Sequence, residues 1–128
     1  MSIASVVTAV VDHVDNMTGL KKTYSSPPDS INLFPAAVVY ARSAAMGNRI
    51  GRGVCDASII TVIVEVHHSR QILPAAVAAS LVWPDLLFAE LQASSTLDVM
   101  YPVNWTAGLL KYAAEDHYGI RFELQVRG

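Results

Sequence analysis

The sequence predicts a single α+β domain in which helices pack on one face of a mostly antiparallel sheet. Its 128 residues are the usual size of one domain. Hydrophobic residues make up 52% of the chain and charged residues 16%, so the chain is too apolar to be disordered. Helical and strand periodicities follow in the order helix, strands, helices, strands, which is typical of an α+β sandwich.

The N-terminal segment, residues 2–17, is predicted to form an amphipathic helix. Apolar residues recur along it at spacings of three and four. Gly19 can adopt the left-handed conformation that ends a helix. A short extended piece is expected at 21–25. Pro27 and Pro28 then predict a rigid loop, because a proline fixes its own φ and keeps the preceding residue out of the α region.

Two strands are predicted next, at 35–41 and 57–67. The first begins on a proline, where no ladder donor is missed, and is rich in valine and tyrosine. The second has apolar residues at its even positions, whereas its odd positions include Thr61, Glu65 and His67. We therefore expect this strand to have one face buried from water and one face with both apolar and polar side chains.

The second half of the chain is predicted to contain helices at 74–82 and 84–91, a loop at 93–102 and two strands. These strands, 105–113 and 118–127, are joined by a turn at 114–117. In the last strand, apolar residues alternate with Arg121, Glu123, Gln125 and Arg127. This period of two predicts one buried face and one face against water or a partner.

Charge and cysteine content exclude several classes of protein. The net charge of -2 provides no overall basic field for nucleic acid. A single cysteine, Cys55, excludes an internal disulfide and a cysteine-based zinc cage. The first residues lack the basic region of a signal peptide. The apolar stretch 72–89 approaches the length of a membrane span, but Pro74, Pro84 and Asp85 interrupt it, so we expect no membrane contact.

No motif in the sequence predicts catalysis, a metal or a cofactor. His67 and His68 are adjacent on a strand, so their side chains should point to opposite faces, and we expect the histidines at the surface or at strand ends. Cys55 lies beside Asp56, which disfavours a thiolate. No nucleophile elbow or phosphate-binding loop is present. The sequence therefore predicts no catalytic residue, no metal ligand, no cofactor and no enzymatic activity.

Two groups of residues are candidates for partner binding. The first is the Gly/Arg-rich hairpin tip at about 42–53, where Arg42, Arg49 and Arg52 have no acidic neighbour to balance them. Guanidinium groups bind carboxylates and phosphates through paired hydrogen bonds, so the tip is either a docking arm or a solvated turn. The second group is on the last strand, whose polar face suits a subunit interface or water: Arg121, Glu123 and Arg127.

The stretch YSSPPDSINLFPAAVVY, residues 24–40, resembles the tail terminator, or tail-completion, proteins of long-tailed bacteriophages. The similarity extends through the Gly-rich hairpin, the strand ending at His67, the helix after Arg70, the STL sequence at 95–97 and the final strand YGIRFELQV at 118–126. Many members of the family have a glycine after the Thr-Leu pair, whereas Asp98 stands there in this chain.

This resemblance implies a single domain over residues 1–128 that acts as a structural virion protein. Such proteins form a ring, typically six-fold, that caps the head-proximal end of the tail tube and stops its growth. The implied partners are other copies of the chain, the tail tube protein and a neck or head-completion protein, with non-specific contact to packaged DNA in the lumen. The implied location is the tail–neck junction of a virion assembled in the host cytoplasm.

Two other functions remain open on the sequence alone. One is a different neck or head-completion (connector) protein, because small α+β ring proteins recur at several levels of such particles. The other is a small-ligand-binding or enzymatic α+β domain, which would need a pocket with a buried polar group.

Overall fold

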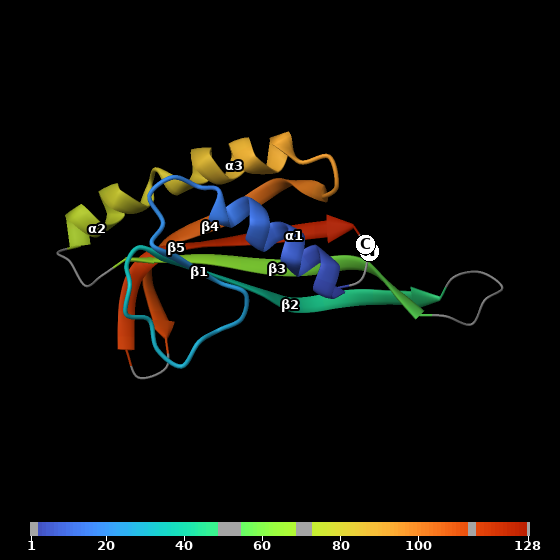
Figure 1. Cartoon of the computed structure of the whole chain (residues 1–128), viewed down its shortest axis with the longest axis horizontal. Coiled ribbons are helices and arrows are strands. Elements are labelled where there is room, and N and C mark those ends of the chain that lie inside the picture. Colours follow the sequence, from blue (N-terminus) through green and yellow to red (C-terminus); the bar gives the residue numbers. More distant parts are fainter. Residues whose placement is uncertain (1–2, 49–54, 69–72, 113–114, 128) are drawn as a thin grey trace.

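A computed structural model describes residues 3–48, 55–68, 73–112 and 115–127 of the chain (Figure 1). Within these residues, helices pack on one face of a five-stranded, mostly antiparallel sheet, so the predicted α+β class is confirmed. The elements in chain order are α1 (Ile3–Asp15), β1 (Lys22–Tyr24), β2 (Ala36–Asn48), β3 (Cys55–His68), α2 (Leu73–Ser80), α3 (Trp83–Ala93), β4 (Asp98–Tyr112) and β5 (Glu115–Arg127).

The strands of the sheet lie in the order β1-β2-β3-β5-β4. The short strand β1 pairs in parallel with residues 36–38 of β2. The other three pairings, β2 with β3, β3 with β5 and β5 with β4, are antiparallel. Figure 1 shows β2 and β3 extending past the N-terminal end of α1. This order places β4 at one edge of the sheet. At the other edge lies β1, which is so short that most of β2 extends beyond it.

One face of the sheet, here called the helix face, is covered by α1 and α3. The even-numbered residues between 60 and 66 of β3 and between 120 and 126 of β5 are fully buried against these helices, as the alternation in the sequence predicts. Burying each such side chain stabilises the fold by roughly 1.5–3 kcal/mol. This core contains Val6, Val10, Val14, Ile60, Val62, Val64, Val66, Trp83, Leu87, Leu91, Ile120, Phe122, Leu124 and Val126.

Helix α1 ends at Asp15, two residues before the predicted end at residue 17, and the predicted glycine lies in the turn that follows. Gly19 has a φ of +101°, a conformation that L side chains rarely adopt. The indole of Trp83 lies 3.6 Å from the position that a Cβ at residue 19 would occupy. The turn after α1 therefore lies directly against the start of α3, and both helices stay on the same face.

Three predicted boundaries are wrong because strand pairing extends further than the local sequence indicates. Residues 42–48 of the predicted tip belong to β2, and residues 49–54 lie outside the described structure. The predicted turn at 114–117 is displaced, because β5 already begins at Glu115, which pairs with Tyr112. The predicted loop at 93–102 overlaps β4, which begins at Asp98 and accommodates Pro102 in a register shift on an edge strand.

The helices in the described part of the chain are short. None of them has both the length and the apolar character needed to cross a membrane.

Candidate functional site

The candidate site is the face of the sheet opposite the helices, here called the open face. Residues paired across neighbouring strands point to the same side, so the register defines this face. Glu65 is opposite Arg121, Asn104 is opposite Glu123, and Asp98 is opposite Arg127. All three predicted interface residues on β5, Arg121, Glu123 and Arg127, thus lie on the open face, and each is exposed.

One end of the open face is covered by the proline-containing segment that precedes β2. Ile31 from this segment is buried together with Ala36 and Val38 of β2. Tyr24, Phe34 and Tyr40 pack around them as a small second core. The segment therefore divides the open face into a covered end and a solvent-exposed remainder.

Glu65 is the centre of a hydrogen-bonded network on the open face. Its side chain is almost buried, and its Oε2 accepts hydrogen bonds from Arg121 Nε at 2.8 Å and from the Tyr40 hydroxyl at 3.3 Å. Its Oε1 lies 3.1 Å from Nε2 of His67. Burial alone would raise the pKa of Glu65, but the hydrogen bonds from His67 and Arg121 and their charges outweigh burial and lower it.

The network continues to a second histidine. Nδ1 of His67 lies 3.3 Å from Nδ1 of His117, and the two rings meet edge to face. Phe34 packs against the other side of the His117 ring, with 5.0 Å between ring centroids. Both histidines lie near strand ends, one of the two expected placements, but neither is at the surface, because Glu65 gives His67 a buried partner and Phe34 covers His117.

His68 points to the opposite face from His67, as predicted. Its Nε2 accepts a hydrogen bond of 2.8 Å from Nε1 of Trp83 at the start of α3. Burial lowers the pKa of His68, and the charge of His67 adds to this effect. Within the described residues, no group of three or more His, Cys, Asp or Glu side chains is arranged to hold a metal ion.

The predicted arginine tip and the predicted β5 interface meet at one residue pair. Arg42 lies where the register of β2 shifts, and its Nη1 is 3.6 Å from Oε2 of Glu123. Both side chains are exposed, as are those of Arg127 and Asp98, which lie 3.5 Å apart. The other predicted tip residues, Arg49 and Arg52, lie outside the described structure.

The ion-paired charges on the described open face are balanced. Three arginines face three acidic residues in the pairs Arg42–Glu123, Arg121–Glu65 and Arg127–Asp98. A phosphate-binding surface would instead carry an excess of positive charge. Alternating charges of both signs suit contact with a protein surface of complementary pattern.

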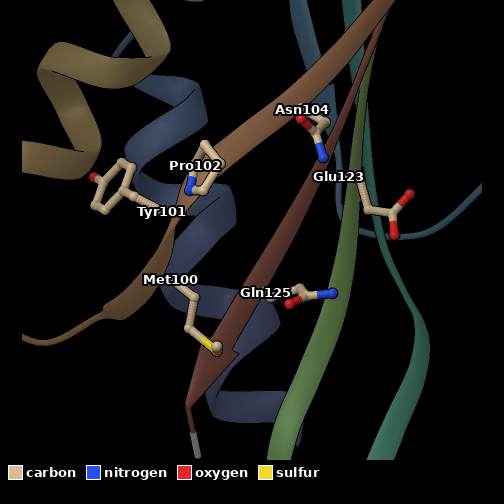
Figure 2. A pocket seen from close by; sticks show the side chains of 6 residues that line it. All are labelled: Met100, Tyr101, Pro102, Asn104, Glu123 and Gln125. Carbon is tan, nitrogen blue, oxygen red and sulfur yellow. The ribbon is translucent and has the colours of Figure 1, made fainter.

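A shallow depression of about 250 Å³ lies on this face where the register of β4 shifts. Figure 2 shows that Tyr101 points away from Glu123 and Gln125, and that Met100 and Asn104 flank the shift. The depression is smaller than most sites for drug-sized ligands, which have volumes of roughly 300–1,000 Å³. The depression is large enough for one side chain of a partner.

The fold has a counterpart among solved structures. The chain is similar to the bacteriophage SPP1 gp17 protein. The similarity has a TM-score of 0.54 at 12% sequence identity and covers 98% of this chain and 90% of that chain. At this identity, the comparison establishes a shared fold. No protein family and no curated protein sequence matches the chain.

The Glu65 network was missed by sequence reasoning. The signal for it was the presence of Glu65 and His67 at odd positions of an otherwise apolar strand, which we interpreted only as a mixed face. Arg121 was identified as an interface residue, but its partner 56 positions earlier in the chain could not be inferred from spacing.

Proposed function

We propose that this chain is a structural virion protein that forms a ring, expected to be a hexamer, on the head-proximal end of a phage tail tube. The ring would end tube polymerisation and provide the surface to which the neck joins. The observation that carries this proposal is the fold shared with a bacteriophage protein over nearly the whole chain. The resemblance of residues 24–40 to tail terminator proteins supports the more specific role.

The open face supports a role in binding other proteins. Its paired arginines and carboxylates are solvent-exposed at Arg42, Glu123, Arg127 and Asp98, and they form a pattern without net charge. Such a surface favours partners with a matching charge pattern, and it discriminates against others by like-charge repulsion. The tail tube protein and a neck protein are the partners that we propose.

We propose no enzymatic activity. In the described open face, the buried titratable groups Glu65, His67 and His117 contact one another and Arg121, and none of them lines the depression beside Glu123 and Gln125. Catalysis needs such groups beside a space for the reacting atoms. The depression beside Glu123 and Gln125 holds neither a histidine nor a cysteine.

In the proposed mechanism, the arginines of the 42–53 tip engage the last ring of the tube or face its lumen. Because each arginine on the described open face lies beside a carboxylate, contact with packaged DNA would depend mainly on Arg49 and Arg52. Replacing Arg49 and Arg52 with glutamate should weaken tail capping while the monomer stays folded. Normal capping by that variant would exclude the tip as the docking arm.

The test of this function is the length of tail tubes in particles assembled without this protein, measured by negative-stain microscopy. Over-length, heterogeneous tubes are the expected result. Tubes of normal length lying apart from filled heads would instead identify a joining protein of the neck, which is the alternative function. Normal particles would contradict both functions.

A further inference from the structure

The sheet has two open edges of considerable length. The whole outer edge of β4 is unpaired within the described chain. On the other side, β1 covers only residues 36–38 of β2, so among the described residues no other strand lies beside 39–48, although Arg42 and the register shift around it interrupt this edge. Unpaired edges expose backbone donors and acceptors, and proteins usually protect them with charged residues, prolines or bulges.

The edge of β4 has such protection at its start and, at Lys111, near its end. Pro102 and the register shift lie between Met100 and Asn104, and Asp98 precedes them. Residues 104–110, NWTAGLL, contain no charge. Trp105 is 40% exposed and Leu109 53% exposed in this segment. An uncharged edge with large exposed apolar side chains is the kind that pairs with another strand.

The open edge of β2 is complementary to β4 in size. Trp105 and Leu109 are opposite Phe122 and Tyr118 in the register, so both side chains lie on the helix-face side of β4. On the same side of β2, the residues opposite Val62 and Ile60 are Ala41 and Ala44. Small side chains on one edge would therefore leave room for the large side chains of the other.

The two edges also carry few charges. Between residues 36 and 45 of β2 the one charged residue is Arg42, and between residues 98 and 110 of β4 it is Asp98. When residues 104–110 of β4 are placed antiparallel to residues 39–45 of β2, Asp98 lies beyond the paired segment. The contact therefore brings no like charges together.

Strand direction allows the same contact to repeat. Three successive antiparallel pairings make β4 antiparallel to β2 within one chain. A second copy rotated about an axis along the strands would thus present its β4 antiparallel to β2 of the first. Each copy would still have one unused edge, which is the condition for head-to-tail contacts to close into a ring.

We propose that β4 residues 104–110 of one copy pair with β2 residues 39–45 of the next copy, which extends the sheet from subunit to subunit. This inference rests on the ring formation in the proposed function and names the contact that builds the ring. The partner is a second copy of this chain.

The test uses one variant for each edge. Leu109→Lys places a charge on β4, and Ala41→Lys, at an exposed position, places one on β2. Leu33→Lys is the matched control, because Leu33 is 55% exposed and lies outside both edge strands. Thermal unfolding and circular dichroism should show that all three variants are folded.

Sedimentation velocity should show concentration-dependent assembly of the wild type and of Leu33→Lys. Each edge variant alone should remain monomeric, with self-association weakened about a hundredfold or more, because an ammonium would be buried without a partner. An equimolar mixture of the two edge variants should form dimers and nothing larger, because only one intact β2 and one intact β4 remain in each pair.

Several results would overturn the inference. The Ala41→Lys variant forming dimers alone would indicate two-fold pairing of β4 with β4. Edge pairing would be excluded if either edge variant assembled as strongly as the wild type. It would also be excluded if the wild type stayed monomeric at its highest soluble concentration. Failure of the proposed function is distinguishable, because it appears as normal tube length in the absence of the protein. Normal capping by Leu109→Lys in tails that do need the protein would reject only the edge contact.

Discussion

The two faces of the sheet are built from the same strands but differ in the kind of side chain that they carry. On β3, Val62, Val64 and Val66 are fully buried against the helices, whereas Glu65 and His67 between them point to the open face. Apart from His68, the helix face is apolar, and other side chains of matching volume could fill it. The open face instead holds charges in a fixed arrangement.

This difference separates stability from recognition. The Arg121–Glu65 pair joins an exposed guanidinium to a buried carboxylate, and it gains little net stability over an apolar pair of the same volume because the carboxylate loses hydration. The fold could therefore form with the whole pair replaced, whereas removing one partner leaves a buried group without its hydrogen bonds. A specific protein partner would recognise the fixed positions of the charged side chains that are exposed on this face.

The helix face should account for the largest loss of stability. Phe122→Ala removes a fully buried ring from the core and should lower the free energy of unfolding by about 3–5 kcal/mol. Urea denaturation would measure this change. Gln125→Ala, on the exposed side of the same strand, is the control and should change stability by less than about 0.5 kcal/mol. Equal losses in the two variants would contradict the division between the faces.

The Glu65 network should give the next largest effect. Glu65→Ala leaves His67 buried without its acceptor and should cost about 2–3 kcal/mol, a cost moderated because Arg121 is partly exposed. Glu65→Gln retains the shape and one acceptor oxygen, so its loss should be smaller. A Glu65→Ala variant as stable as the wild type would show that the network is dispensable for folding.

Acid should lower stability in two steps. The pKa of His68 is lowered by burial and by the charge of His67, so as the pH falls through 6.5 the unfolded chain gains a proton that the fold does not. Stability should therefore decrease below that pH. The pKa of Glu65 lies below its usual value of 4.5, so its contribution is present above pH 4.5 and is lost at lower pH.

Urea midpoints measured from pH 7 to pH 3 would test both steps. His68→Asn should abolish the first step and keep the second, whereas Glu65→Gln should do the reverse. Stability that rises as the pH falls through the first step would contradict the burial of neutral His68.

The exposed pairs of the open face should matter least for folding. Arg127→Ala removes a 3.5 Å contact with Asp98 between two exposed side chains and should change the free energy of unfolding by less than about 0.5 kcal/mol. A loss of several kcal/mol, measured by the same denaturation, would assign the pair a structural role instead.

The helix face could be predicted from sequence because its signal is local. Alternation in residues 118–127 and at even positions of β3 is enough to identify which side chains are buried. The open face depends on pairings between distant positions, such as Glu65 with Arg121 and His67 with His117. Arg121, Glu123 and Arg127 could be identified as one polar face, but their partners on β2, β3 and β4 required the register of the sheet.

The boundaries near Arg42 and Pro102 were mispredicted for the same reason. Arginine, glycine and proline all favour loops locally. Ladder pairing with β3 and β5 keeps both segments in strands and absorbs the extra residues in register shifts.

The most direct test of the account is the length of tail tubes assembled with an Arg42→Glu, Glu123→Arg variant. This exchange keeps the pair within the chain but reverses the charge that each position presents to a partner. With unfolding unchanged, the account predicts over-length tubes, as in the absence of the protein. Tubes of normal length from the folded variant would show that the open face does not dock on the tube.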